Sequence, residues 1–277
     1  MKSVRIDDFE DPRIDDYRNL KDAALATRRS RFIVEGRGNL RVLLDRSAFE
    51  PDSILLSERS LRAMERELEA LAPRCPILVA EQSVLDQIVG FPIHRGSLAV
   101  CARGPGADPL ELARQLRAGE PAPRLIVLEG LTNHDNVGGI FRNAMALGGD
   151  AVLLCARSCD PLYRKAIRTS MGGSLCVPFA RAPVLRDLLL GLSDLGYALL
   201  ALDPDPSGSD LAELDAGSLG PVALLLGTEG EGLTEETLAL SDQRLRVEMT
   251  PGVDSLNVSV AAAIALHRLW VQPRERG

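Results

Sequence analysis

Short apolar runs alternate with longer amphipathic segments in the first part of the chain. The runs that are apolar throughout predict buried strands at 32–34, 54–56, 77–79 and 98–102. The clearest helix is predicted over 58–71, where apolar residues lie on one face and charged residues on the opposite face. The apolar face consists of Leu61, Met64, Leu68 and Leu71. Such a stripe is typical of a helix that packs on a core rather than of a binding groove.

The second part of the chain repeats this alternation with longer apolar runs. Strands are predicted at 125–128, 151–155, 175–177, 197–202, 222–226 and 244–247. Helical patterns separate most of them, and the last helix, predicted over 257–270, is rich in alanine and in larger apolar residues. Strands that are apolar throughout and alternate with helices indicate an α/β fold, with a parallel sheet that helices cover on both faces.

A proline-rich stretch divides the two parts. The acidic segment 7–16 is predicted to be a loose lead-in, followed by a helix over 18–31. Residues 109–117 are predicted to form a linking helix, and Pro121 and Pro123 then block the continuation of helix and sheet. The sequence therefore predicts a first domain over 1–115, a linker over 116–123 and a second domain over 124–277. A chain of 277 residues is long enough for two domains.

Composition narrows the class of protein. The chain has no apolar stretch long enough to cross a membrane and no apolar leader, so we expect a cytoplasmic protein without a membrane partner. Five cysteines, mostly within apolar runs, indicate free thiols in a reducing compartment. Cys155 and Cys159 lack a second Cys or His pair at the right spacing, so no metal site is predicted. The net charge of −7 does not indicate a generally basic nucleic-acid binder, although a few placed arginines can bind phosphates.

The first candidate site is the segment NHDNVGGIFRNA at 133–144, which follows a predicted strand. Ligands of α/β proteins bind where a strand ends and a helix begins. Asn136 is suited to cap a helix that starts at Val137, while Gly138 and Gly139 allow close approach of another backbone or a ribose phosphate. Arg142 would reach a phosphate or a developing alkoxide. Alone, the segment is better explained as a capped helix that carries a surface arginine.

The second candidate is the turn GTEGEG at 227–232, directly after the predicted strand 222–226. It does not have the glycine spacing of a dinucleotide fingerprint, and no Gly-Lys-Ser/Thr follows. Its two glutamates would repel phosphates, whereas a neutral adenosyl group with a cationic sulfonium suits an acidic, glycine-rich turn. A tight turn between strand and helix is the simpler alternative, and both readings can hold together.

The third candidate is the segment DSLNVSVA at 254–261, where a polar loop enters the alanine-rich last helix. Ser255, Asn257 and Ser259 bring hydroxyl and amide groups to the start of that helix. Capping of the helix by Ser255 or Asn257 is the simplest function of these residues.

Together and in this order, the three segments resemble the SpoU/TrmH family of RNA ribose methyltransferases, over roughly residues 125–272. The resemblance implies a knotted parallel-sheet methyltransferase domain with a deep trefoil knot. It also implies S-adenosyl-L-methionine as cofactor, a ribose 2′-hydroxyl of structured rRNA or tRNA as the methyl acceptor, and a homodimer with sites completed across the interface. Glu248 stands where the family often has proline, a departure that concerns the cofactor loop.

The resemblance also implies roles for individual residues. Arg142 would activate the acceptor, and Asn136, Glu229, Ser255 and Asn257 would orient Arg142 and the target. The adenosine moiety would be held by Leu202, Gly227, Val247 and Leu256.

The first part of the chain resembles the small α/β RNA-binding domain that often precedes the catalytic domain in this family. The residues that carry this shorter match are RFIVEG at 31–36 and HRG at 94–96. The basic residues near the match are predicted to bind RNA: Arg28, Arg29, Arg31 and Arg37. Two alternatives stay open, a knotted methyltransferase that modifies a base, and an RNA-binding or assembly protein that has lost catalysis on the same scaffold.

Overall fold

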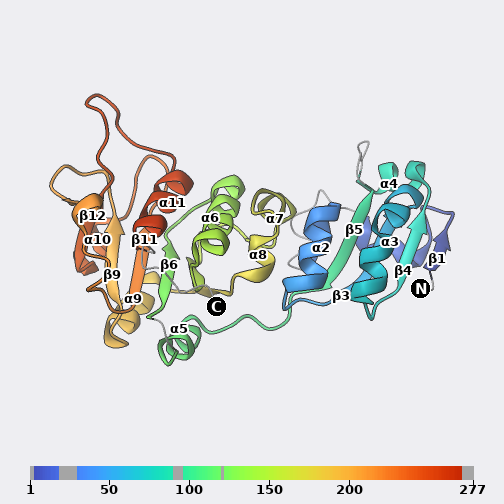
Figure 1. Cartoon of the computed structure of the whole chain (residues 1–277), viewed down its shortest axis with the longest axis horizontal. Coiled ribbons are helices and arrows are strands. Elements are labelled where there is room, and N and C mark those ends of the chain that lie inside the picture. The colour runs from blue at the N-terminus through green and yellow to red at the C-terminus, as the bar shows by residue number, and fades with distance from the viewer. Residues whose placement is uncertain (1–2, 19–29, 90–95, 120–121, 270–277) are drawn as a thin grey trace. The chain divides into compact units, whose positions relative to one another are not determined.

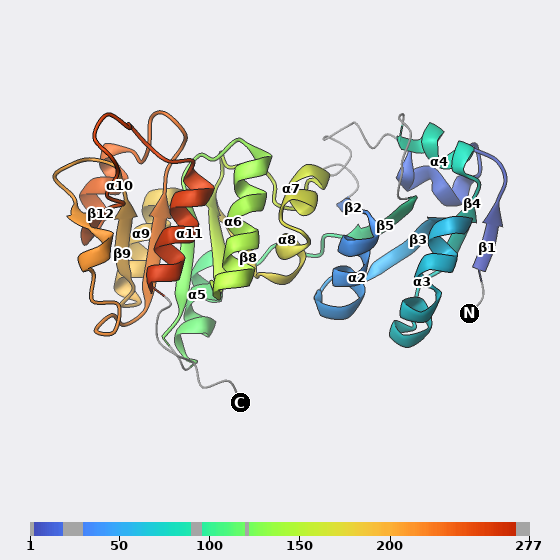
Figure 2. The same cartoon turned by 45° about the horizontal axis from the view of Figure 1, so that its top comes forward.

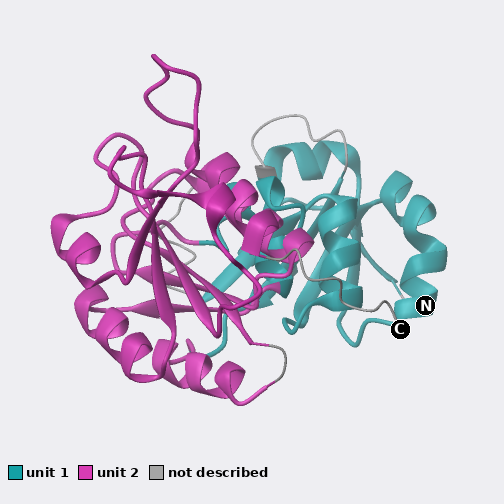
Figure 3. Cartoon of the chain, turned by 60° about the vertical axis from the view of Figure 1, so that its left-hand side comes forward, with its two compact units in different colours: residues 1–105, 161–176 teal, residues 106–160, 177–277 magenta. Residues whose placement is uncertain are grey.

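The chain divides into two compact units in the computed structural model (Figures 1 and 3). The structure describes residues 3–18, 30–89, 96–119 and 122–269. The first unit comprises residues 1–105 and 161–176, and the second comprises 106–160 and 177–277. The division thus follows Pro105 rather than residue 115, because the predicted linking helix α5 (Pro109–Arg117) packs on α9 (Leu185–Asp194) of the second unit.

The first unit contains a mixed five-stranded sheet. Its strand order is β1 (Ser3–Ile6), β4 (Ile77–Ala80), β3 (Pro51–Ser57), β5 (Ser97–Ala102) and β2 (Arg31–Glu35). The first three strands are parallel, and β5 runs antiparallel to both of its neighbours. The accompanying helices are η1 (Pro12–Tyr17), α2 (Arg37–Arg46), α3 (Glu58–Leu71), α4 (Gln82–Val89), α7 (Arg164–Thr169) and α8 (Gly173–Cys176).

The four strands and the amphipathic helix predicted for this part are confirmed, and the bounds of α3 are those predicted. The prediction of a loose lead-in was wrong, because η1 begins there. Asp11 caps it by accepting a hydrogen bond from the backbone N–H of Arg13, and a proline stands in its first turn. Most of the helix predicted over 18–31 falls outside the described residues, and its last residue, Arg31, begins β2.

The second unit is built on a seven-stranded sheet in which every pairing is parallel. The order is β10 (Ser209–Asp210), β12 (Gln243–Arg246), β9 (Ala198–Leu202), β11 (Val222–Leu226), β6 (Arg124–Leu128), β7 (Ala151–Cys155) and β8 (Phe179–Ala182). Five of the six strands predicted here are present, with small differences at their ends. The predicted α/β class with a parallel sheet is therefore confirmed.

Helices cover both faces of this sheet. Ile126 and Leu128 contribute to one core together with α6 (His134–Leu147) and α11 (Val258–Leu269), which lie side by side (Figure 2). Leu125 and Val127 point to the other core, which is covered by α5, α9 and α10 (Glu235–Leu240). This alternation explains why the strands are apolar throughout.

One strand was predicted wrongly. Residues 175–177 were expected to form a strand, but Leu175 and Cys176 end the short helix α8, and the strand of this region, β8, begins at Phe179. Leu175 is buried in the helix as it would be in a strand. A short apolar run cannot distinguish the two, because both bury all of its side chains.

The described helices contain none that is both long and apolar enough to traverse a lipid bilayer.

Candidate functional site

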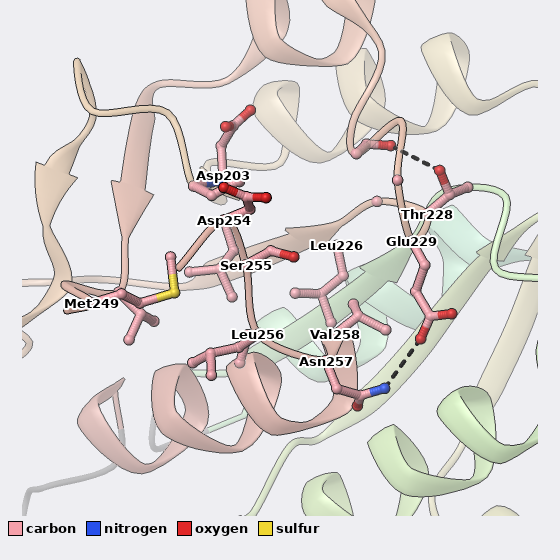
Figure 4. Close-up of a pocket in the computed structure, with 17 residues that line it drawn as sticks. Asp203, Leu226, Thr228, Glu229, Met249, Asp254, Ser255, Leu256, Asn257 and Val258 are labelled. Carbon is pink, nitrogen blue, oxygen red and sulfur yellow. Dashed lines mark hydrogen bonds between the residues drawn. The ribbon is translucent and has the colours of Figure 1, made fainter. Parts of the chain in front are cut away.

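A cavity of about 590 Å³ opens at the carboxyl ends of β9, β11 and β12 (Figure 4). Its lining comes from four segments that are distant in sequence, within 202–204, 226–232, 247–249 and 254–261. All four belong to the second unit. This is the edge of a parallel sheet at which ligands of α/β proteins bind.

The lining is apolar on one part and acidic on another. The apolar part includes Leu202, Leu226, Val247, Leu256 and Val258. Carboxylates come from Asp203, Glu229 and Asp254, and none of the described lysines and arginines lines the cavity. Such a cavity suits a ligand with a flat apolar moiety and a positive charge, and it disfavours a phosphorylated ligand.

The glycine-rich turn forms one wall of the cavity. Thr228 and Gly232 exchange backbone hydrogen bonds of 3.0 and 3.2 Å, which close the turn on itself. A Cβ on Gly227 would lie 2.1 Å from the carbonyl carbon of Gly232, so only glycine fits there. Gly230 has φ +96°, a conformation that glycine adopts readily. The turn is therefore rigid, and its backbone faces the cavity directly.

A hydrogen-bonded cluster of three polar side chains lies at one end of the cavity. The Asn136 amide donates to Glu229 Oε1, and the Asn257 amide donates to the same oxygen at 3.1 Å. Asn257 Nδ2 also donates to Asn136 Oδ1 at 3.0 Å. Asn136 is only 5% exposed, so its amide depends on these partners. The cluster brings together one residue from each of the three sequence segments.

Asn136 does not cap α6 as predicted. The helix begins at His134, and Asn133 caps it by accepting a hydrogen bond from the backbone N–H of Asp135 at 2.9 Å. Asn136 lies within the first turn instead. Its side chain is thereby available for Glu229 and Asn257.

Asn257 caps α11, in agreement with the sequence pattern. Its Oδ1 accepts hydrogen bonds from the backbone N–H of Ser259 at 3.0 Å and from the Ser259 hydroxyl at 2.7 Å. The amide nitrogen remains directed at Asn136 and Glu229. One side chain thus fixes the start of α11 and completes the polar cluster.

Helices α6 and α11 approach each other closely beside this cluster. A Cβ on Gly139 would lie 2.9 Å from Cβ of Ser259, so glycine permits the contact. The Asn143 amide donates to the backbone carbonyl of Ser259 at 2.6 Å. The second glycine of the first segment therefore serves helix packing in this structure.

The structure gathers most of the predicted site residues at the cavity. The four predicted cofactor residues, Leu202, Gly227, Val247 and Leu256, all line it, as do three of the predicted catalytic residues, Glu229, Ser255 and Asn257. Asn136 adjoins them through its hydrogen bonds. Arg142 lies on α6, exposed, and does not line the cavity.

The predicted RNA-binding arginines are less uniform. Arg31 forms ion pairs with Asp16 and, at 3.2 Å, with Asp52. Arg37 is exposed at the start of α2, beside a hollow of about 380 Å³ that Arg41 and Glu67 also line. The other two, Arg28 and Arg29, lie outside the described residues.

Sequence reasoning missed several residues that shape the site. Asp203 lines the cavity at the end of β9, and its neighbourhood in the sequence reads only as a surface loop. Glu129 is 4% exposed, and its carboxylate accepts a hydrogen bond from the backbone N–H of Thr234 at 3.2 Å. An acidic residue directly after an apolar strand was the available signal for Glu129. Asn143 and Ser259 lay within the quoted segments, but their contact joins two distant helices.

A parallel α/β unit with an acidic and apolar cavity beside an Asn–Glu–Asn cluster is suited to bind a small ligand that is partly apolar and positively charged. Residues 123–267 match the SpoU rRNA methylase family, which is more than half of the chain. The chain is also 39% identical over 265 residues to an uncharacterised tRNA/rRNA methyltransferase of Mycobacterium tuberculosis, covering 94% of this chain and 89% of that protein. The chain therefore belongs to the SpoU family of RNA methyltransferases.

Solved structures share the fold across both units. An AdoMet-bound rRNA methyltransferase from Sinorhizobium meliloti has a TM-score of 0.81 at 22% identity, with 96% of this chain and 97% of that chain covered. A structure described as an RNA 2′-O ribose methyltransferase has a TM-score of 0.75 at 25% identity, with 96% and 98% covered. The first of these likenesses concerns the fold alone.

S-Adenosylmethionine is the cofactor of this family, and the cavity fits it. Apolar side chains and the Gly227 backbone suit the adenosine moiety. The carboxylates of Asp203, Glu229 and Asp254 suit the sulfonium and ammonium charges.

Replacing Leu256 by Arg is expected to weaken S-adenosylmethionine binding by at least about tenfold, or about 1.4 kcal/mol. A long charged side chain would occupy the apolar part of the cavity, which Leu256 lines. Calorimetric titration of the purified variants measures the effect. Val253→Arg is the matched control, because Val253 is 51% exposed in the same loop but does not line the cavity. Equal affinities of the two variants would contradict the assignment.

Proposed function

We propose that this protein transfers the methyl group of S-adenosylmethionine to a ribose 2′-hydroxyl of structured rRNA or tRNA in the cytoplasm. The observation that carries the proposal is the cluster of Asn136, Glu229 and Asn257 beside the cavity. It provides fixed polar groups next to the bound cofactor, where an acceptor hydroxyl would have to be oriented. The likeness to a structure described as an RNA 2′-O ribose methyltransferase, at 25% identity, supports it.

Methyl transfer requires the protein to position the two reactants more than to activate the bond that breaks. The cofactor supplies a methyl group already activated by a sulfonium, so the chain has to orient the 2′-oxygen and stabilise its developing negative charge. Arg142 would provide that stabilisation, or would hold the adjoining phosphate. A guanidinium has a pKa above about 12, so electrostatic activation is favoured over proton removal by the arginine itself.

The polar cluster would orient the reacting groups. Glu229 accepts two amide hydrogen bonds, which leaves its carboxylate fixed at the end of the cavity. Ser255 lines the same cavity and is exposed, so its hydroxyl is accessible to a bound substrate. The ribose would thus be oriented by Asn136, Glu229, Ser255 and Asn257. Arg142 would stabilise the negative charge that develops on the 2′-oxygen.

The second unit would close the deep trefoil knot through its carboxyl-terminal segment and pair with a second copy of the chain. True knots are rare, so the knot rests on membership of the family. For the dimer, α11 presents Val260 and Ile264, one turn apart and 48% and 39% exposed. An apolar stripe on a helix that already packs its other face suits a second copy.

The first unit would bind the RNA. Arg37 and Arg41 on α2 stand beside one hollow, although Glu67 binds Arg41. Arg31 is a weaker candidate for phosphate binding, because its guanidinium already forms ion pairs with Asp16 and Asp52. Arginines suit this task because the planar guanidinium can bind a phosphate through two hydrogen bonds.

The two alternative functions differ in product. A base-methylating enzyme of the same class would leave ribose unmodified, and a protein without catalysis would leave no methyl group. Mapping 2′-O-methyl sites in cellular RNA with and without this protein tests the proposal. A methylated site that disappears with the protein supports it and identifies the RNA, and a change confined to base methylation would refute it.

Arg142→Ala is expected to lower the methyl transfer rate by about two to three orders of magnitude, the scale for losing one preorganised charge-stabilising group. The affinity for S-adenosylmethionine should change little, since Arg142 does not line the cavity. Radiolabelled methyl transfer and calorimetry measure the two quantities. Arg114→Ala, an exposed residue on α5, is the control. Near-normal turnover of the Arg142 variant would exclude it as the activating group.

Arg37→Ala is expected to weaken RNA binding by about tenfold, or about 1.4 kcal/mol. The slope of log affinity against log salt should also fall by about 0.7 to 0.9, the value for one lost phosphate contact. Filter binding at several salt concentrations provides both values. Arg31→Ala serves as comparison, because its ion pairs with Asp16 and Asp52 predict a smaller effect. A larger loss of RNA affinity in Arg31→Ala than in Arg37→Ala would contradict the assignment of RNA binding to α2.

Ile264→Glu is expected to convert the dimer to monomers and to lower activity with it, while each chain stays folded. Sedimentation at several protein concentrations measures the assembly. Leu269, near the end of the same helix, is 3% exposed and belongs to the core. Leu269→Glu should therefore unfold the unit rather than separate copies. A wild-type protein that is a fully active monomer would contradict the dimer.

A further inference from the structure

The cavity leaves part of the sheet edge available for a second ligand. It lies at the ends of β9, β11 and β12, whereas β6 and β7 continue the same edge beyond β11. In the parallel register, Leu226 of β11 is paired with Leu128 of β6, and Leu128 with Leu154 of β7. The residues just after β6 and β7 therefore adjoin the Glu229 turn on the side opposite the cavity. The exposed Arg157 stands there, two residues after β7.

Gly130 brings Arg157 and the turn of Glu229 together. A Cβ placed on Gly130 would lie 3.1 Å from Cγ2 of Thr228 and 3.9 Å from an Nη atom of Arg157. Thr228 lines the cavity and immediately precedes Glu229. The guanidinium of Arg157 thus lies beside Gly130, the second residue after β6. Gly130 itself has φ +68°.

The turn that carries Arg157 is held from both sides. The buried thiol of Cys155 accepts a hydrogen bond from the backbone N–H of Gly130 at 3.0 Å. Burial raises the pKa of Cys155, but a hydrogen bond with the Ser158 side chain and those from the backbone N–H groups of Gly130, Arg157 and Ser158 bring the pKa below its ordinary value. The Arg181 guanidinium donates to the carbonyl oxygens of Cys155 at 3.0 Å and Ser158 at 2.7 Å.

The same turn is tied to the segment that leads into α6. The Ser158 hydroxyl donates to the carbonyl of Leu128 at 3.1 Å, and the backbone N–H of Cys159 donates to the carbonyl of Leu131 at 2.7 Å. The backbone of Arg157 is therefore fixed relative to the start of α6 and the Asn136 cluster. No carboxylate of the described residues forms an ion pair with its guanidinium. Within the described part of the chain this charge has no ion-pair partner, while the turn that carries it is held by the hydrogen bonds given above.

We propose that Arg157 binds a backbone phosphate of the RNA substrate next to the methylated nucleotide. The acidic cavity repels phosphates, whereas the charge of Arg157 on the side of β6 and β7 attracts them, so this charge favours an approach of the RNA from that side. An arginine on a fixed turn positions the strand through its phosphate without reading a base. This assignment rests on the proposed function and adds a positioning residue to it.

Equilibrium binding of the full-length protein to rRNA and tRNA from cells that lack it tests the assignment directly. Arg157→Ala is expected to raise the Kd about tenfold and to lower the salt slope by about 0.7 to 0.9. Arg157→Lys should restore part of the affinity, since a point charge still attracts a phosphate. In methyl transfer, the KM for RNA should rise with little change in kcat, and the Kd for S-adenosylmethionine should stay the same. Arg186→Ala, an exposed arginine paired with Glu236 on the other face of the sheet, is the control.

Unchanged Kd and salt slope in Arg157→Ala would overturn the assignment. An equal loss in the Ala and Lys variants, accompanied by a lower melting temperature, would also overturn it, since that result indicates a structural role. Failure of the proposed function gives a different result, because the wild-type protein would then bind RNA without forming 2′-O-methylribose. The effect of Arg157 on RNA affinity can be measured in either case.

Discussion

The hydrogen bonds among Asn136, Glu229 and Asn257 are the constraint on which the site depends. Asn136 and Glu229 are 93 positions apart in the chain, and Asn136 and Asn257 are 121 apart. One carboxylate oxygen accepts both amides, and only Asn136 is buried, so replacing Glu229 or Asn257 leaves a buried polar atom of Asn136 without its partner. The cluster thereby fixes the start of α11 against the first turn of α6 and holds the turn that walls the cavity.

Close backbone approach makes this geometry possible. Gly139 allows α6 to contact Ser259 of α11, and Gly227 allows the turn to fold back onto Gly232. A side chain at either position would require backbone to move, and both the cavity and the cluster would change with it. The two glycines thus act through packing. By allowing close contact, they position the polar side chains of the cluster.

Charge is segregated around this geometry. Among the described residues, carboxylates and no basic side chains line the cavity, whereas Arg142 and Arg157 are exposed outside it. A protein of net charge −7 can therefore combine an acidic site for a cationic cofactor with separate arginines for a polyanion. The arrangement follows from sheet topology, because neighbouring strand ends supply different side chains to adjoining parts of one edge.

The sequence by itself determined the parallel α/β class, most of the strands and the three segments that meet at the cavity, because the spacing of apolar residues is a local property. Tertiary structure decided the rest. Residues 175–177 lie at a helix end despite an apolar run typical of a strand, and Asn136 pairs with Glu229 instead of capping its helix. Arg31 is held by acidic partners, and Leu269 is buried while Ile264 is exposed. In each case the conformation or contacts of the residue depend on which side chains distant in the sequence become its neighbours. A local sequence pattern does not contain that information.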